Sequence, residues 1–173
     1  LEQLAAKLDD LAAKIRKNRE KAIPVLKREL ESNLEYLGMP NASFQFNLEE
    51  TKYYTSTGKD KIVLLFTANK GLAYGTLQKV ASGGELSRIM LSIKAVLARY
   101  KELPTLIFDE IDTGVSGEIA SKIGDLMGQM SETMQLLCIT PSPQMPAKGK
   151  QHLNLYNHDS AKATVTKLKE LTS

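Results

Sequence analysis

Several residue types are scarce in this chain of 173 residues, and each scarcity narrows the class of protein. It has one cysteine, which excludes a disulfide framework and leads us to expect a reducing compartment, the cytoplasm. No run approaches the roughly 18 apolar residues of a membrane-spanning helix, so we expect no membrane partner. The formal net charge of +3 is small, and composition therefore neither requires nor excludes nucleic acid as a partner.

Residues 1–38 follow the periodicity of an amphipathic helix. Side chains of a heptad seam return at steps of three and four, as in a coiled coil, with one polar position, Asn18, among the apolar Leu1, Leu4, Leu8, Leu11, Ile15, Ala22 and Val25. No later segment repeats this pattern, so the partner helix is expected from before Leu1. Pro24 is predicted to kink or restart the helix, and the charged side chains, including Arg16 and Arg19, are expected to stay solvated. Residues 1–38 are thus assigned to the end of a coiled-coil arm, with a long surface helix as the alternative.

After Pro40 the apolar pattern changes from helical to strand-like. Short apolar runs, "KIVLLFTAN", "TLIFDE" and "MQLLCIT", alternate with predicted helices over residues 82–100 and 117–130. Such runs between helices are typical of a parallel sheet covered on both faces. We therefore predict an α/β lobe over residues 39–173, with a mostly parallel sheet flanked by helices and a C-terminal edge hairpin. Cys138, inside an apolar run, is expected to be buried.

The stretch "SGGEL" places two glycines at the start of a predicted helix. Ser82 and Glu85 have the spacing of a capping box, in which each side chain bonds the backbone N–H of the other residue. Capping does not require Gly83 and Gly84, since glycine in a helix costs about 1 kcal/mol relative to alanine. Bare amides at a helix N-terminus favour a bound anion, of which phosphate is the natural candidate. A tight turn that happens to contain two glycines is the alternative.

The run "TLIFDE" delivers Asp109 and Glu110 at the carboxyl end of a predicted strand, the edge at which open α/β sheets bind ligands. Adjacent acids are costly to desolvate unless a cation or a reacting water uses them. Asp109 suits magnesium, which prefers one or two carboxylates together with phosphate oxygens. Glu110 suits the polarisation of an attacking water. A helix N-cap and a solvated acid are the alternative interpretation.

Together these motifs resemble the heads of ABC-type ATPases, with "SGGEL" similar to the signature loop and "TLIFDE" to the Walker B strand. More narrowly, "KVASGGELSRIMLSIK" and "PTLIFDEIDTGVSGEIA" resemble the C-terminal head lobe of the RecN family, SMC-like proteins of bacterial DNA double-strand break repair. The resemblance spans nearly the whole chain and is most specific over residues 77–120. It implies a cytoplasmic, nucleoid-associated protein whose partners include DNA.

The resemblance also implies a role for the glycine turn in a pair of heads. Two heads enclose two ATP molecules with Mg²⁺, and the signature loop of each head faces the nucleotide of the other. Carried over, Ser82, Gly83 and Gly84 hold the γ-phosphate in trans, while Glu85 shapes the turn. The other implied partners are the chain's own Walker A lobe with its coiled-coil arm and a second head.

The acids and the loop behind them acquire implied roles in the same way. Asp109 serves magnesium bound with ATP, and Glu110 is the catalytic residue that activates water. Residues 112–116 form the D-loop at the dimer seam, from Asp112 to Ser116. Ser116 departs from the aspartate that many ABC heads have at this position, which weakens this part of the resemblance.

Two further departures qualify the expected activity. The pattern G-x-x-x-x-G-K-[ST] is absent from the sequence, so the chain alone is predicted neither to bind ATP tightly nor to hydrolyse it. The run "LLCIT" should lead to a switch histidine, yet the position holds Pro141, which has no side-chain donor and no N–H. His152 is not expected to substitute. The alternative function is a catalytically decayed head that serves as a coiled-coil and dimerisation module.

Overall fold

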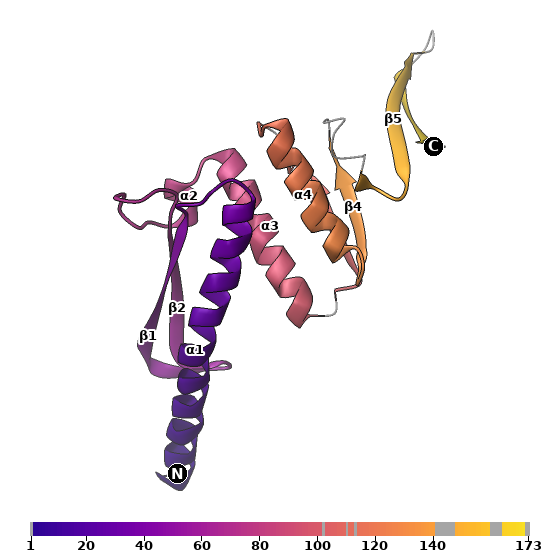
Figure 1. Ribbon diagram of the computed structural model, residues 1–173. Helices are drawn as coiled ribbons and strands as arrows, with labels where there is room; N and C mark the ends of the chain where they lie inside the picture. The colour runs from indigo at the N-terminus through magenta and orange to yellow at the C-terminus, as the bar shows by residue number, and fades with distance from the viewer. Residues whose placement is uncertain are drawn as a thin grey trace. The chain divides into compact units, whose positions relative to one another are not determined.

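The computed structural model describes residues 2–101, 103–109, 111–112, 114–140, 148–159 and 164–171 (Figure 1). The chain divides into two compact units, Leu1–Glu102 and Leu103–Ser173. None of the described helices combines the length and the apolar character that crossing a membrane requires. The glycine turn belongs to the first unit, and the acids after the apolar strand belong to the second.

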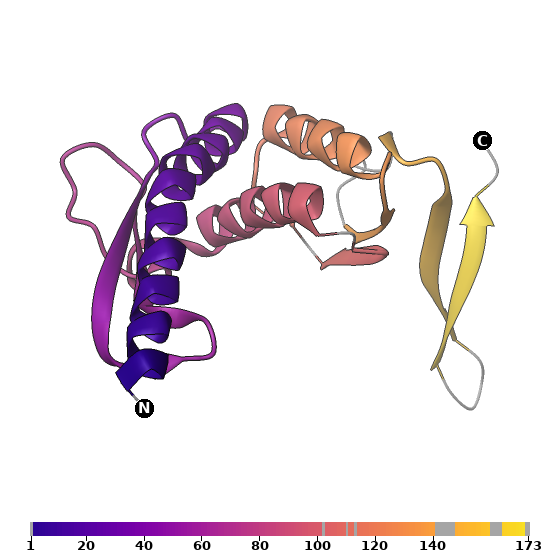
Figure 2. The same ribbon diagram turned by 90° about the horizontal axis from the view of Figure 1, so that it is seen from below.

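The first unit combines a long helix with a hairpin and a shorter helix. Helix α1 (Glu2–Tyr36) lies beside the antiparallel strands β1 (Ser43–Thr55) and β2 (Gly58–Thr67) in both views (Figures 1 and 2). The strands turn back between Thr55 and Gly58, where Gly58 adopts a φ of 111° that favours glycine. The short helix α2 (Leu77–Val80) and helix α3 (Gly83–Tyr100) follow.

The core of the first unit joins α1, the hairpin and α3. Phe44 and Phe66 face each other across the hairpin, with ring centroids 5.1 Å apart. Buried side chains from both helices complete this core, namely Leu30, Leu34, Ile89 and Val96. Burial of side chains this large is the main stabilising contribution to such a unit. The core therefore fixes the start of α3 against the rest of the unit.

The N-terminal part of α1 carries the predicted coiled-coil seam on an exposed face. Its larger apolar side chains are exposed, at Leu4, Leu8, Leu11, Ile15 and Val25. Pro24 lies inside the helix, which continues through it, so the predicted restart does not occur. The prediction of a helix over residues 1–38 is thus confirmed for Glu2–Tyr36. The apolar seam on this helix is exposed and therefore accessible to a partner helix.

The second unit is built on one β-α-β crossover. Strands β3 (Thr105–Asp109) and β4 (Gln135–Ile139) pair in parallel, and helix α4 (Gly117–Met130) connects them. Helix α4 buries an apolar face that includes Ala120, Ile123 and Leu126. Strands β5 (His152–Asp159) and β6 (Thr164–Leu171) form an antiparallel hairpin, as predicted.

The predicted mostly parallel sheet is wrong for the described residues. They form three two-stranded sheets, of which only β3 and β4 pair in parallel. Parallel strands need a crossover connection of a dozen or more residues, and α4 provides it for this pair alone. The run "KIVLLFTAN" follows a tight turn instead, so β2 pairs antiparallel with β1.

Candidate functional site

The turn before α3 has the predicted capping box. The amide of Ser82 donates to Glu85 Oε2 at 2.8 Å, and the amide of Glu85 donates to Ser82 Oγ at 3.4 Å. The backbone hydrogen bond from Ser82 lowers the pKa of Glu85, and the charge of Arg88 acts in the same direction. Glu85 is therefore a charged side chain committed to the shape of the turn.

Gly83 is exposed, and nothing in its surroundings requires a glycine. A Cβ built at Gly83 would meet no heavy atom within 4 Å. Its φ is not positive, so an L-residue could adopt the same backbone conformation. The first amides of a helix have no intrahelical acceptor, and here they lie at the positive end of an 18-residue helix. The space beside the backbone at Gly83 is therefore open, and packing within the described residues does not account for the glycine.

Asp109 is the last residue of β3, pairs with Ile139 of β4 and is exposed. The acid thus lies at the carboxyl end of the parallel strands, as the sequence predicted. Glu110 and Pro141, for which the sequence predicted a catalytic and a switch position, lie outside the described residues. No group of three or more metal-ligating side chains occurs among the residues that the structure describes.

The loop between β3 and α4 is anchored by two polar side chains. Asp112 is 5% exposed, and its Oδ2 accepts a hydrogen bond from Thr140 Oγ1 at 2.6 Å. Ser116 is the N-cap of α4, where its Oγ accepts from the amide of Ile119 at 3.5 Å. Gly114 has a φ of 74° between these anchors. Thr140 was not predicted as a site residue from the sequence. It is the polar residue that ends the apolar run "LLCIT", and this position at a strand end could have indicated it.

The prediction that Cys138 is buried is wrong, because it is exposed on β4. Strand β4 pairs only with β3 among the described strands, so one edge of this short sheet is not covered by a third strand. Enough protein nevertheless surrounds the sulfur that desolvation, followed by the charges of Asp112 and Asp109, raises the pKa of Cys138 to about 11. The thiol is therefore protonated and weakly nucleophilic near neutral pH.

The two histidines lie on β5, where the sequence predicted surface positions. His158 is exposed, and His152 is half-buried. The Nε2 atom of His152 lies 3.0 Å from the carbonyl oxygen of Gly149. This ring is thus engaged with its local backbone.

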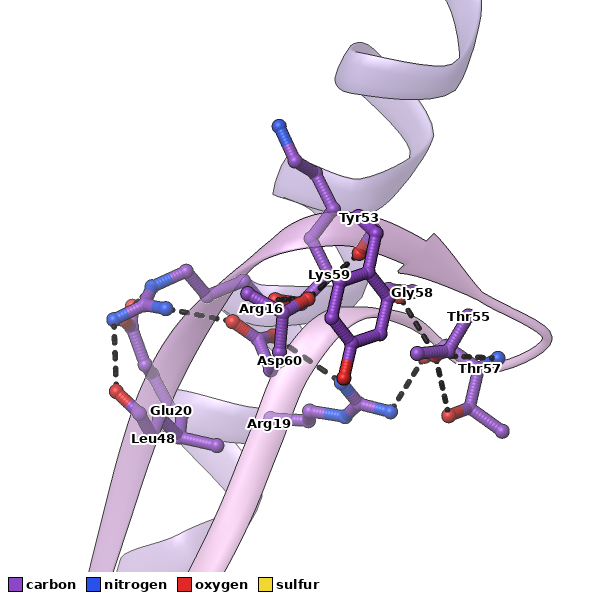
Figure 3. A network of polar contacts seen from close by, with 11 residues as sticks. Arg16, Arg19, Glu20, Leu48, Tyr53, Thr55, Thr57, Gly58, Lys59 and Asp60 are labelled. Atoms are coloured by element: carbon purple, nitrogen blue, oxygen red, sulfur yellow. Dashed lines mark hydrogen bonds and ion pairs between the residues drawn. The ribbon is translucent and has the colours of Figure 1, made fainter.

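A second polar cluster joins the arm helix to the hairpin in the first unit. Asp60, whose side chain is 2% exposed, accepts from Arg16 Nη1 at 2.6 Å and from Arg19 Nη1 at 3.2 Å. Figure 3 shows the two guanidinium groups on either side of the carboxylate, and Arg19 also donates to the carbonyl of Thr57 at 2.6 Å. The expectation of solvated side chains is wrong for Arg19, which is 21% exposed, whereas Arg16 keeps 37% of its side chain exposed while it bonds Asp60. Their i, i+3 spacing puts them on one helix face, but only the hairpin supplies the acid.

Sequence comparisons show which known proteins this chain resembles. No protein-family model matches the chain. The DNA repair protein RecN of Rickettsia conorii is 36% identical over 168 residues, which are 97% of this chain and 31% of that protein. The chain resembles the C-terminal part of RecN. It spans about a third of the length of the RecN proteins it matches, 31% in this case.

Solved structures similar to this RecN-like chain are heads of SMC proteins. The Smc head domain with a coiled coil and joint from Pyrococcus yayanosii has a TM-score of 0.75 and 18% identity, over 99% of this chain and 31% of that chain. A chain from work on ATP-driven dimerisation and DNA-stimulated activation of SMC ATPases has a TM-score of 0.60 and 20% identity, over 88% of this chain and 86% of that chain. The fold is therefore that of a lobe of an SMC-type head.

Proposed function

We propose that the chain is the C-terminal lobe of the head of a RecN-like DNA repair ATPase. In the protein at its full natural length, ATP pairs two heads through their signature loops and is then hydrolysed between them. The observation that carries this proposal is the exposed turn at Gly83, where neither packing nor backbone conformation requires a glycine. A γ-phosphate presented by a second head would use the space that a side chain would fill.

The first unit supplies the phosphate-binding turn of the proposal. Ser82, Gly83 and Gly84 bind phosphate oxygens, and the charged Glu85 holds the turn in shape through Ser82. Because the carboxylate of Glu85 is engaged in the capping box, it does not compete with phosphate for the open amides. The amides of the turn are thus already oriented for an anion, and the Glu85 carboxylate does not occupy them.

The acids fit a magnesium ion that arrives with ATP. Asp109 offers an exposed carboxylate at the end of β3, and no group of three or more metal-ligating side chains occurs among the described residues. Magnesium accepts one or two carboxylates and takes its remaining ligands from water and phosphate oxygens. When bound, the ion would neutralise charge on the phosphates. Glu110 would orient and deprotonate the attacking water, and residues 112–116 would lie at the seam between heads.

The partners in this proposal are a Walker A lobe and coiled-coil arm of the same protein, a second head and DNA. The exposed seam of α1, from Leu4 to Ile15, supports pairing of the arm with another helix. The chain spans about a third of the matched RecN proteins, 31% of the one from Rickettsia conorii, so a longer protein has room for the remaining lobe. The DNA part of the proposal rests on the resemblance to RecN.

A decayed head that acts mainly through its arm and dimer seam is the second candidate. Pro141 favours it, because proline at the switch position can neither donate to a γ-phosphate nor orient water. In this version the protein would bind ATP and pair its heads but would hydrolyse ATP slowly. The retained Asp109 and Glu110 argue against complete decay.

ATP turnover at full natural length separates these candidates. We expect measurable turnover in the parent protein, its loss in E110Q, and an increase in P141H. Head pairing with ATP but no turnover, unchanged by P141H, would favour the decayed module. Neither pairing nor turnover in the presence of ATP and Mg²⁺ would overturn the proposed function.

A further inference from the structure

Asp112 has a buried carboxyl group, one oxygen of which has no hydrogen-bond partner among the described residues. It is 5% exposed, and Thr140 donates to its Oδ2 at 2.6 Å. Its other oxygen, Oδ1, is buried and has no hydrogen-bond partner among the described residues. Buried polar atoms are almost always paired, and an unpaired carboxylate oxygen is among the costliest exceptions. The acid is therefore not explained by stability, since an apolar residue or an amide could be buried there at lower cost.

The bond to Thr140 joins two points at the same edge of the parallel strands. Asp112 lies three residues after Asp109, the end of β3, and Thr140 directly follows Ile139, the end of β4. Asp109 and Ile139 are register partners across the two strands. A side-chain hydrogen bond just beyond this last pair therefore extends the attachment of the two strands past the end of the backbone ladder.

The remainder of the loop is held from its other end. Ser116 caps α4, and the amide of Val115 donates to the carbonyl of Asp112 at 3.4 Å. The neighbouring Ile111 is buried at 4% exposure. The described part of the loop after β3 is thus anchored at the cap of α4 and, through the bond to Thr140, at the end of β4.

We propose that Asp112 is a positioning residue, which through Thr140 fixes the backbone after β3 against the end of β4 and so holds Asp109 at the sheet edge. This inference rests on the proposed function, in which Asp109 serves ATP hydrolysis. Asp112 itself touches no reacting atom. Its effect is to keep Asp109 in place at the carboxyl end of the parallel strands.

Hydrogen exchange tests the bond itself without any nucleotide. In the 173-residue chain, T140V removes the donor with little change of shape, whereas T140S keeps the hydroxyl. We expect amides of residues 111–116 to exchange about tenfold faster in T140V, the loss expected for one charge-assisted bond, and at the parent rate in T140S. D112N, which keeps an acceptor for Thr140 but removes the charge, should exchange faster than the parent and more slowly than T140V. Equal exchange in T140V and the parent would overturn the proposal.

Steady-state hydrolysis at full natural length tests the role of the bond. We expect T140V to lower kcat about tenfold with little change in KM for ATP, and T140S to restore it. A loss of exchange protection with unchanged kcat would overturn the positioning role while leaving the proposed function intact. If the parent protein hydrolyses no ATP, the hydrolytic part of the proposed function fails instead, and the positioning role fails with it even where the exchange contrast confirms the bond.

Discussion

Removing the arginines that hold Asp60 should destabilise the first unit more than removing Asp60 itself. The carboxylate is 2% exposed, whereas the side chains of Arg16 and Arg19 are 37% and 21% exposed. The R16A/R19A variant leaves a buried charge without a cation, a change that costs about 3–5 kcal/mol in buried pairs. Because part of the Arg16 side chain is exposed to solvent, we expect the free energy of unfolding to fall by the lower end of this range, about 3 kcal/mol. In D60A both arginines can turn toward water, so the loss should be nearer 1.5 kcal/mol.

Urea unfolding, followed by tyrosine fluorescence and far-UV circular dichroism, measures these losses. Five of the six tyrosines lie in the first unit, so their fluorescence reports mainly on it. The triple variant R16A/R19A/D60A should recover part of the loss of R16A/R19A, because it removes the stranded charge. The matched control is K14A, which breaks an exposed pair with Asp10 and should cost less than about 0.5 kcal/mol. A loss in R16A/R19A no larger than in K14A, or a triple variant less stable than the double, would refute the reasoning.

Three further predictions concern the glycine turn and Cys138. G83A should leave the stability of the chain unchanged or raise it by about 0.5–1 kcal/mol, since alanine favours a helix and meets no neighbour; clear destabilisation in urea would contradict the open turn. S82A and E85Q should each cost about 1 kcal/mol near pH 7. Because the folded pKa of Glu85 is lowered, its contribution is complete above the unfolded pKa and is lost as the pH falls through the folded pKa, so the deficit of E85Q should shrink in acid; a constant deficit would argue against it. Alkylation of Cys138, the chain's one cysteine, should follow a pH profile with a midpoint near 11 that moves down in D112N, and an ordinary thiol profile would contradict the assigned surroundings.

Local features of the fold could be predicted from the sequence, whereas features that depend on distant partners could not. The capping box needs only the spacing of Ser82 and Glu85, and it forms as predicted. The bond between Arg16 and Asp60 joins residues 44 apart in the chain, and helical periodicity places the arginine on a face without saying what covers it. An arginine is solvated by default, and only the packed hairpin changes that.

The pairing of the strands was the least predictable feature. An apolar run such as "MQLLCIT" indicates burial but not the number of neighbouring strands, which is why Cys138 was expected inside and is exposed. The position of Asp109 at a strand end followed from the boundary of its apolar run. The hydrogen bond between Asp112 and Thr140 could not be predicted from the sequence, because it depends on the register of β3 against β4.

The most direct test of the account is ATP-dependent pairing of heads in the protein at its full natural length, measured by light scattering after size exclusion. G128A is the matched control, because a Cβ at Gly128 in α4 would also meet no heavy atom within 4 Å, and this residue lies outside the proposed site. The account predicts that the parent and G128A pair when ATP and Mg²⁺ are added, and that G83A binds ATP but stays unpaired. Pairing of G83A at the parent level would contradict the claim that the bare backbone at this turn receives a phosphate from a second head.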